Sequence, residues 1–180
     1  MAAPLIFCQV KGFQRTGVSP TMKLTTRRLV RGALIAALYA VLCMAFFSIS
    51  YGDVQFRISE ALTVLPLLMP EAIPGLLVGC LLSNLLGGYG VMDIVFGSLA
   101  TLFASVATYF LRKLPAWIAV LPVVLVNALV VGYFTLHLAA GLPFWPSALS
   151  VGLGEAVVVY ALGLPLYYAL KRFLPDRFLH

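Results

Sequence analysis

Glu60 and Glu155 are the side chains of this sequence best placed to do chemistry, because each lies within or at the edge of an apolar segment. A carboxylate in such surroundings is costly, so it usually faces the interior of a helix bundle and has a partner there. Other candidates supply further acceptors, amide or guanidinium donors and aromatic faces: Tyr51, Gln55, Arg57, Asn84, Asp93 and Trp145. This mixture of groups predicts the binding of a small polar ligand.

Structural roles compete with ligand binding at these positions. Glu155 can form a structural pair with an asparagine or an arginine, and Arg57 can pair with Glu60 three residues later or hold the preceding loop. Asn127 lies nearer the middle of its apolar segment, which favours a helix-bridging role for its amide. Trp145 can belong to an aromatic belt at a membrane interface.

Several classes of enzyme are excluded by missing motifs. The sequence contains no GxxxxGK[ST] phosphate loop, no HExxH and no GxSxG, so nucleotide hydrolysis, zinc proteolysis and serine hydrolysis are not expected. The three cysteines are isolated and odd in number, which indicates neither a metal site nor a disulfide framework. We therefore expect no enzyme activity, no metal and no cofactor.

The composition defines the class of protein. Of the 180 residues, 62% are hydrophobic and only 10% are charged, whereas soluble domains carry about 25% charged residues. A water-facing surface cannot be built from so few charges, so a soluble globular protein is excluded. The net charge of +6 arises from clusters at the ends of apolar runs, which is typical of membrane topology rather than of nucleic-acid binding.

The apolar runs predict an all-α membrane protein with six transmembrane helices. Prolines break the region 61–86, and the positive-inside rule favours two crossings there, because both later basic clusters then share one side with Arg27, Arg28 and Arg31. The predicted spans are residues 29–49, 57–69, 72–87, 91–111, 116–140 and 147–170. Both termini are then cytoplasmic, with residues 1–21 as a tail that need not be native, 22–174 as the helical domain and 175–180 as a second tail.

In this topology the charged residues are distributed unequally between the two sides of the membrane. Eleven of the twelve basic residues fall on the cytoplasmic side, the exception being Arg57, while four of the six acids fall toward the outside. The inner half has no continuous row of acids, and paired broken helices of the secondary-transporter kind are missing. A site open only to the outside cannot transport by itself, so we expect a binding subunit whose energy source lies in another chain.

Small residues follow the first predicted span in a pattern that permits close helix contact. Ala33, Ala36, Ala37 and Ala40 form two small-xxx-small pairs that begin beside the cytoplasmic arginines. Packing within the bundle and docking of another membrane protein both explain this stripe.

The run Tyr51-Gly52-Asp53-Val54-Gln55-Phe56-Arg57-Ile58-Ser59-Glu60-Ala61-Leu62 resembles the signature of the QueT family. Further matches are Gly79-Cys80, Asn84, Gly90, Asp93, Val95 to Ser98, Thr101, Leu142 to Pro146 and Gly154-Glu155. The resemblance covers about residues 23–173. Members of this family are the substrate-binding S components of energy-coupling factor (ECF) transporters, assigned to queuosine precursors.

The resemblance implies a six-helix S component in the bacterial cell membrane, which captures its substrate on the outer face. The implied partners are a membrane coupling subunit (EcfT-like), which would contact Ala33, Ala36, Ala37 and Ala40, and two cytoplasmic ATPases (EcfA-like). The implied ligand is a 7-deazaguanine such as preQ1, preQ0 or queuine. An S component for another vitamin-like substrate and a self-sufficient transporter are the alternatives.

The chemistry of such a ligand assigns roles to the candidate residues. We expect Glu60 or Glu155 to accept hydrogen bonds from the guanine-like edge, as carboxylates do from donor edges of bases. The ligand carbonyl would be bound by Asn84, Gln55 or Arg57, and its flat face would stack on Trp145 or Tyr51. Asp93 would orient the loop or meet an aminomethyl group.

Overall fold

The computed structural model describes residues 25–47, 56–88 and 90–173, and every regular element within these ranges is helical. Six helical segments lie at the six predicted positions. They are α1 (Thr26–Ala45), η1 (Ile58–Leu67), α3 (Ala72–Gly87), η2 with α4 (Asp93–Gly97, Ser98–Phe110), α5 with α6 and η3 (Ala116–Ala119, Leu121–Val130, Val131–Ala139), and α7 with η4 and α8 (Phe144–Val158, Val159–Gly163, Leu164–Phe173).

Four of these segments are long and apolar enough to cross a membrane: Thr26–Ala45, Asp93–Phe110, Ala116–Ala139 and Phe144–Phe173. The proline-broken region forms the two shorter helices η1 and α3, as the sequence predicts, with 10 and 16 residues. Proline and glycine explain several boundaries. Pro115 and Pro143 directly precede α5 and α7, where proline's fixed φ is tolerated. Gly88 ends α3 with a φ of 70°, a conformation that favours glycine.

The short helix η1 forms the centre of the bundle. It is a 3₁₀-helix of 10 residues, although runs longer than three or four residues are uncommon. Residues 59–66 are all buried, because η1 packs against α1, α3, α4, α7, η4 and α8. Its backbone therefore lies inside protein, where non-helical or strained segments are tolerated at membrane depth.

Glycines allow the helices to approach closely. A Cβ added at Gly75 of α3 would lie 2.6 Å from the carbonyl oxygen of Gly32 of α1, and one added at Gly79 would lie 2.9 Å from the carbonyl oxygen of Ala36. A Cβ at Gly132 of η3 would lie 2.8 Å from the Cα of Ala148 of α7. These contacts are of the small-residue kind that holds membrane helices together, where apolar burial gives little driving force.

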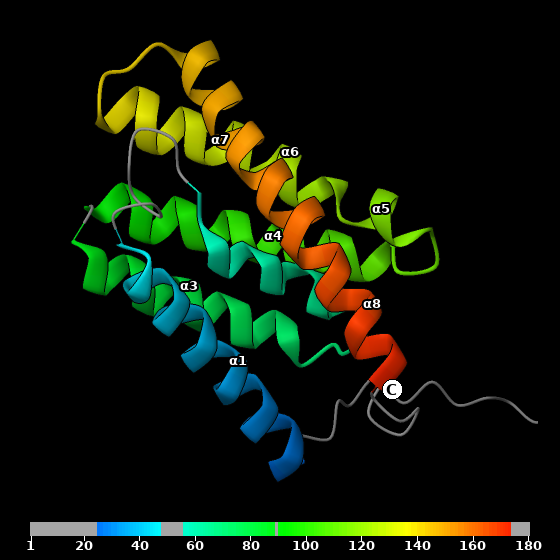
Figure 1. The fold of residues 1–180 in the computed structure, drawn as a ribbon. Helices are drawn as coiled ribbons and strands as arrows, with labels where there is room; N and C mark the ends of the chain where they lie inside the picture. The colour runs from blue at the N-terminus through cyan, green and yellow to red at the C-terminus, as the bar shows by residue number, and fades with distance from the viewer. Residues whose placement is uncertain (1–24, 48–55, 89, 174–180) are drawn as a thin grey trace, which may run out of the picture.

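The basic residues are concentrated at one end of the bundle. The start of α1 and the end of α8 lie at the same end, together with the links between η1 and α3 and between α4 and α5 (Figure 1). Seven of the eight lysines and arginines in the described ranges belong to this basic end: Arg27, Arg28, Arg31, Arg112, Lys113, Lys171 and Arg172. Arg31 there donates to Glu71 at 2.9 Å. The eighth is Arg57, which immediately precedes η1 at the opposite end of the bundle.

Candidate functional site

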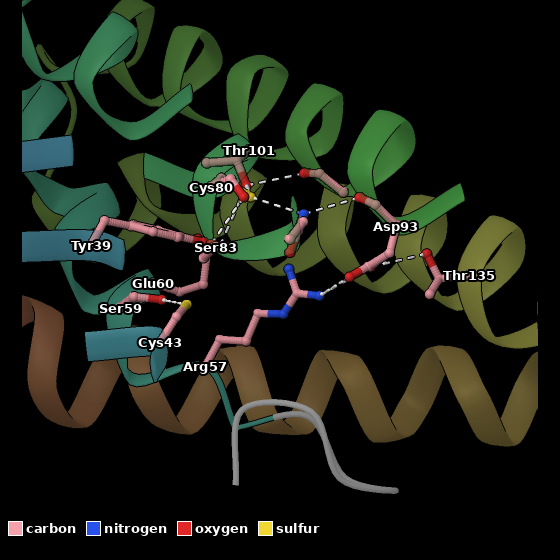
Figure 2. Close-up of polar contacts among 12 residues, drawn as sticks. Tyr39, Cys43, Arg57, Ser59, Glu60, Cys80, Ser83, Asp93, Thr101 and Thr135 are labelled. Carbon is pink, nitrogen blue, oxygen red and sulfur yellow. Dashed lines mark hydrogen bonds and ion pairs between the residues drawn. The ribbon is translucent and has the colours of Figure 1, made fainter. Parts of the chain in front are cut away.

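A buried polar network occupies the half of the bundle opposite the basic end (Figure 2). Its side chains come from five of the six helical segments, and each of them is at most 9% exposed. The members of this buried polar network are Tyr39, Cys43, Arg57, Ser59, Glu60, Cys80, Asn84, Asp93, Thr101 and Thr135. So many polar groups in an apolar bundle are stable only when hydrogen bonds satisfy them.

Glu60 lies at the start of η1 with one carboxylate oxygen bonded and the other free. Its Oε1 accepts a short hydrogen bond from the Tyr39 hydroxyl and a longer one, 3.4 Å, from Thr101. Its Oε2 is buried and has no hydrogen-bond partner among the described residues. The carboxylate is thus held in place by α1 and α4 while one acceptor remains available.

Arg57 and Asp93 form a buried ion pair between segments distant in sequence. The Nη2 of Arg57 donates to both carboxylate oxygens of Asp93 at 3.1 Å, and the two side chains are only 4% and 1% exposed. The Thr135 hydroxyl of η3 lies 3.4 Å from Oδ1 of Asp93. The Asn84 amide donates to the backbone carbonyl of Asp93 at 3.0 Å. The pair therefore connects the start of η1 with α3, η2 and η3.

The local backbone leaves room for this ion pair. Asp93 begins η2, a π-helical turn, and such turns often occur at functional sites. A Cβ added at Gly97 would lie 3.0 Å from the Asn84 amide nitrogen and 3.3 Å from Oδ1 of Asp93. A larger residue at position 97 would thus displace the side chains that hold Arg57.

A second carboxylate and an amide lie beside this network. Glu155 of α7 and Asn127 of α6 are 3% and 2% exposed, and their helices pack against each other. Glu155 lies close to Asn127 and within electrostatic range of Glu60 and Arg57. However, Oε2 of Glu155 and Nδ2 of Asn127 both lack a hydrogen-bond partner among the described residues. Oε2 of Glu60, Oε2 of Glu155 and the Asn127 amide are therefore among the buried groups that a ligand can meet here.

The structure gathers most, but not all, of the predicted site residues. The buried ones are Arg57, Glu60, Asn84, Asp93 and Glu155. Trp145 is instead 72% exposed and contacts Phe144 at the surface. Tyr51 and Gln55 lie outside the described residues. The ion-pair partner of Arg57 is Asp93 rather than Glu60, whereas the loop that Arg57 was alternatively expected to hold lies outside the described residues.

Six residues of the network are not among the site residues predicted from the sequence: Tyr39, Cys43, Ser59, Cys80, Thr101 and Thr135. Tyr39 is the only tyrosine within α1, and Thr101 and Thr135 lie in helices that are mostly apolar. A lone polar side chain in such a helix is a weak signal, because serine and threonine often hydrogen-bond within their own helix. Only the tertiary contacts with Glu60 and Asp93 distinguish Tyr39, Thr101 and Thr135 from ordinary helix residues.

The alanines of α1 divide between two faces. Ala36 is 5% exposed and packs against Gly79 of α3, so its contact lies within the bundle. Ala40 is half-buried, whereas Ala33 and Ala37 are exposed. The exposed face of α1 also carries Leu34, Leu38 and Val41, which are 65%, 48% and 61% exposed. The stripe predicted from the sequence therefore serves internal packing at Ala36 and leaves a small-residue surface at Ala33 and Ala37.

Fold and site together define a helical membrane protein with a buried polar site confined to one half of its bundle. The model of the QueT transporter family matches residues 29–172, so the chain belongs to this family.

One similar protein carries a curated name. The "Queuosine precursor transporter QueT" of Lactococcus lactis subsp. cremoris (strain MG1363) is 38% identical over 82 residues, which is 44% of this chain and 48% of the relative. The match thus spans about half the length of that relative. No solved structure matches this chain at a significant level.

The buried ion pair yields a test by a double-mutant cycle. Asp93→Asn leaves a buried guanidinium without its counter-charge, and breaking such a pair costs about 3–5 kcal/mol. We expect this variant to melt well below the parent in detergent, while adding Arg57→Gln recovers part of the loss. Strictly additive effects of the two substitutions would contradict the pairing.

Proposed function

We propose that this chain is the substrate-binding S component of an ECF-type importer for a queuosine precursor in a bacterial cell membrane. Family membership and the name of the Lactococcus lactis relative support transport of such a precursor. The observation that carries the ligand assignment is the pair of buried carboxylate oxygens, Oε2 of Glu60 and Oε2 of Glu155, without partners among the described residues. Buried acceptors of this kind are complementary to a ligand that presents N–H donors.

A 7-deazaguanine such as preQ1, preQ0 or queuine has the required donors. The ring N1–H and the exocyclic amine of its guanine-like edge can both be accepted by carboxylates. Glu60 is held for this role by Tyr39 and Thr101. Asp93 positions Arg57 through both of its carboxylate oxygens. Because each carboxylate oxygen can accept more than one hydrogen bond, contact of Asp93 with an aminomethyl group of the ligand stays part of the proposal. Stacking of the ligand on Tyr51 or Trp145 remains part of the proposal.

The charge distribution supports an orientation in the membrane. Loops rich in lysine and arginine stay in the cytoplasm, so the basic end would face inward. The described chain would then cross the membrane six times with both ends inside. The buried polar network would lie in the outer half, where a substrate arriving from outside can reach it.

Delivery of the substrate requires partners in this proposal. The sequence has no phosphate-binding loop, so ATP would be hydrolysed by two separate cytoplasmic ATPases (EcfA-like). A membrane coupling subunit (EcfT-like) would dock on the exposed face of α1 around Ala33 and Ala37, where small side chains permit close approach of helices.

The ligand assignment predicts a loss of affinity on removing either charge. A good bidentate pair between a side chain and a base edge is worth about 1–3 kcal/mol, so Glu60→Gln and Glu155→Gln should each weaken binding of preQ1 or preQ0 about 5- to 150-fold. The measurement is isothermal titration calorimetry on the purified protein. Glu71→Gln, which removes the acid paired with Arg31 at the basic end, is the matched control and should bind like the parent. Unchanged affinity in both site variants would refute the assignment.

The docking proposal predicts a selective loss of assembly. Ala37→Trp places a large side chain on the exposed face of α1 and should abolish co-purification with the coupling subunit while ligand affinity stays unchanged. Leu125→Trp is the control, since Leu125 is 57% exposed on α6. Retained assembly of the Ala37 variant would exclude this face as the docking surface. Uptake into vesicles that hold only this chain would instead favour a self-sufficient transporter.

A further inference from the structure

Asn127 is a buried amide whose nitrogen has no hydrogen-bond partner among the described residues, although the side chain is only 2% exposed. The sequence alone favoured a helix-bridging role for it. A bridge would use its N–H groups, because leaving a buried donor unpaired is unfavourable and uncommon in folded proteins. The neighbouring Oε2 of Glu155 is unpaired in the same way. The side chains of the two residues lie within hydrogen-bonding range of each other, and Oε2 of Glu155 and Nδ2 of Asn127 still have no partner among the described residues. Both atoms are therefore available to a third group.

Two of the other candidate donors for a ligand carbonyl, Asn84 and Arg57, already hold neighbouring parts of the chain. The third, Gln55, lies outside the described residues. The Asn84 amide donates to the backbone carbonyl of Asp93 at 3.0 Å, and it also lies 3.5 Å from Sγ of Cys80. Nη2 of Arg57 donates to both oxygens of Asp93. Both side chains therefore serve the framework around η2. Asn127, by contrast, lies on α6 close to Glu155 of α7 and takes no part in the hydrogen bonds of Asn84 or the Arg57–Asp93 ion pair.

We infer that Asn127 is a specificity-determining residue that donates a hydrogen bond to the carbonyl oxygen of the bound deazapurine. This inference rests on the proposed function. An amide donor adjacent to a carboxylate acceptor is complementary to an edge on which a carbonyl oxygen adjoins a ring N–H, as in guanine. Adenine-like rings present the reverse pattern at these two positions. Asn127 thus selects the oxo-purine, while Glu155 and Glu60 accept from its N–H groups.

The test compares two ligands that differ only at the carbonyl. The probes are 7-deazaguanine and its 6-thio analogue, which keeps the ring N–H and the amine but has a weaker acceptor. Titration calorimetry of the purified full chain measures both affinities for the parent, Asn127→Leu and Asn127→Ala. Thr108→Ala is the matched control, because its buried hydroxyl also lacks a partner among the described residues but lies in the last turn of α4 at the basic end.

The parent should bind the oxo ligand several-fold more tightly than the thio ligand. Loss of the amide should lower the affinity for the oxo ligand about ten-fold or more, because the carbonyl of that ligand is then buried without a hydrogen bond. The affinity for the thio ligand should fall by less than about three-fold. The preference for the oxo ligand over the thio ligand should therefore disappear in the Asn127 variants and persist in the Thr108→Ala control.

Three results would overturn the inference. Equal weakening of both ligands in the Asn127 variants would indicate a structural role, and unchanged affinities would place the ligand elsewhere. In both of these cases the parent still binds, so the proposed function survives. Failure of the parent to bind either ligand would refute the proposed function, and this assignment with it. Melting curves of each variant separate misfolding from loss of contact, and the two substitutions at position 127 guard against one that fails to fold.

Discussion

The buried ion pair between Arg57 and Asp93 is the interaction on which the half of the bundle opposite the basic end depends. A charge cannot remain in such an environment unless it is paired and hydrogen-bonded, because desolvation outweighs an imperfect Coulomb attraction. Arg57 directly precedes η1, so its attachment to Asp93 determines where that central helix begins. Glu60 is three residues further on, and its position between α1 and α4 follows from this attachment. The ion pair thus orients the site.

The two halves of the bundle differ in how many polar contacts join their helices, although close glycine contacts occur in both, as between Gly132 and Ala148. Toward the basic end, glycines bring α1 and α3 into backbone contact, which relies on packing rather than polar attraction. Toward the other end, hydrogen bonds join side chains from nearly every helix. Oε2 of Glu60 and Oε2 of Glu155 are buried and have no hydrogen-bond partner among the described residues. A rigid packed base beneath a polar site suits a protein that holds a small ligand while a partner performs the energy-requiring step.

The sequence predicted the six helical segments because apolar runs, prolines and basic clusters are local signals that specify where a helix begins and ends. It also identified Glu60 and Glu155, since an acid in an apolar run is expensive. It could not predict the partner of Arg57, because Asp93 is 36 positions away and only the packing of η2 against α3 and η3 brings it close. For the same reason it could not tell that Ala36 turns inward to Gly79 or that Asn127 adjoins Glu155. Such facts depend on helix rotation, which apolar periodicity determines poorly when a helix is hydrophobic on all sides.

The central claim is that the free oxygens of Glu60 and Glu155 face a shared ligand. A structure of the purified protein determined with bound 7-deazaguanine tests it most directly. The account predicts that the guanine-like edge lies within about 3.2 Å of Oε2 of both glutamates, the upper limit of an ordinary hydrogen bond. Ligand density that contacts neither glutamate, or glutamates that retain the same unpaired oxygens when the ligand is bound, would contradict it.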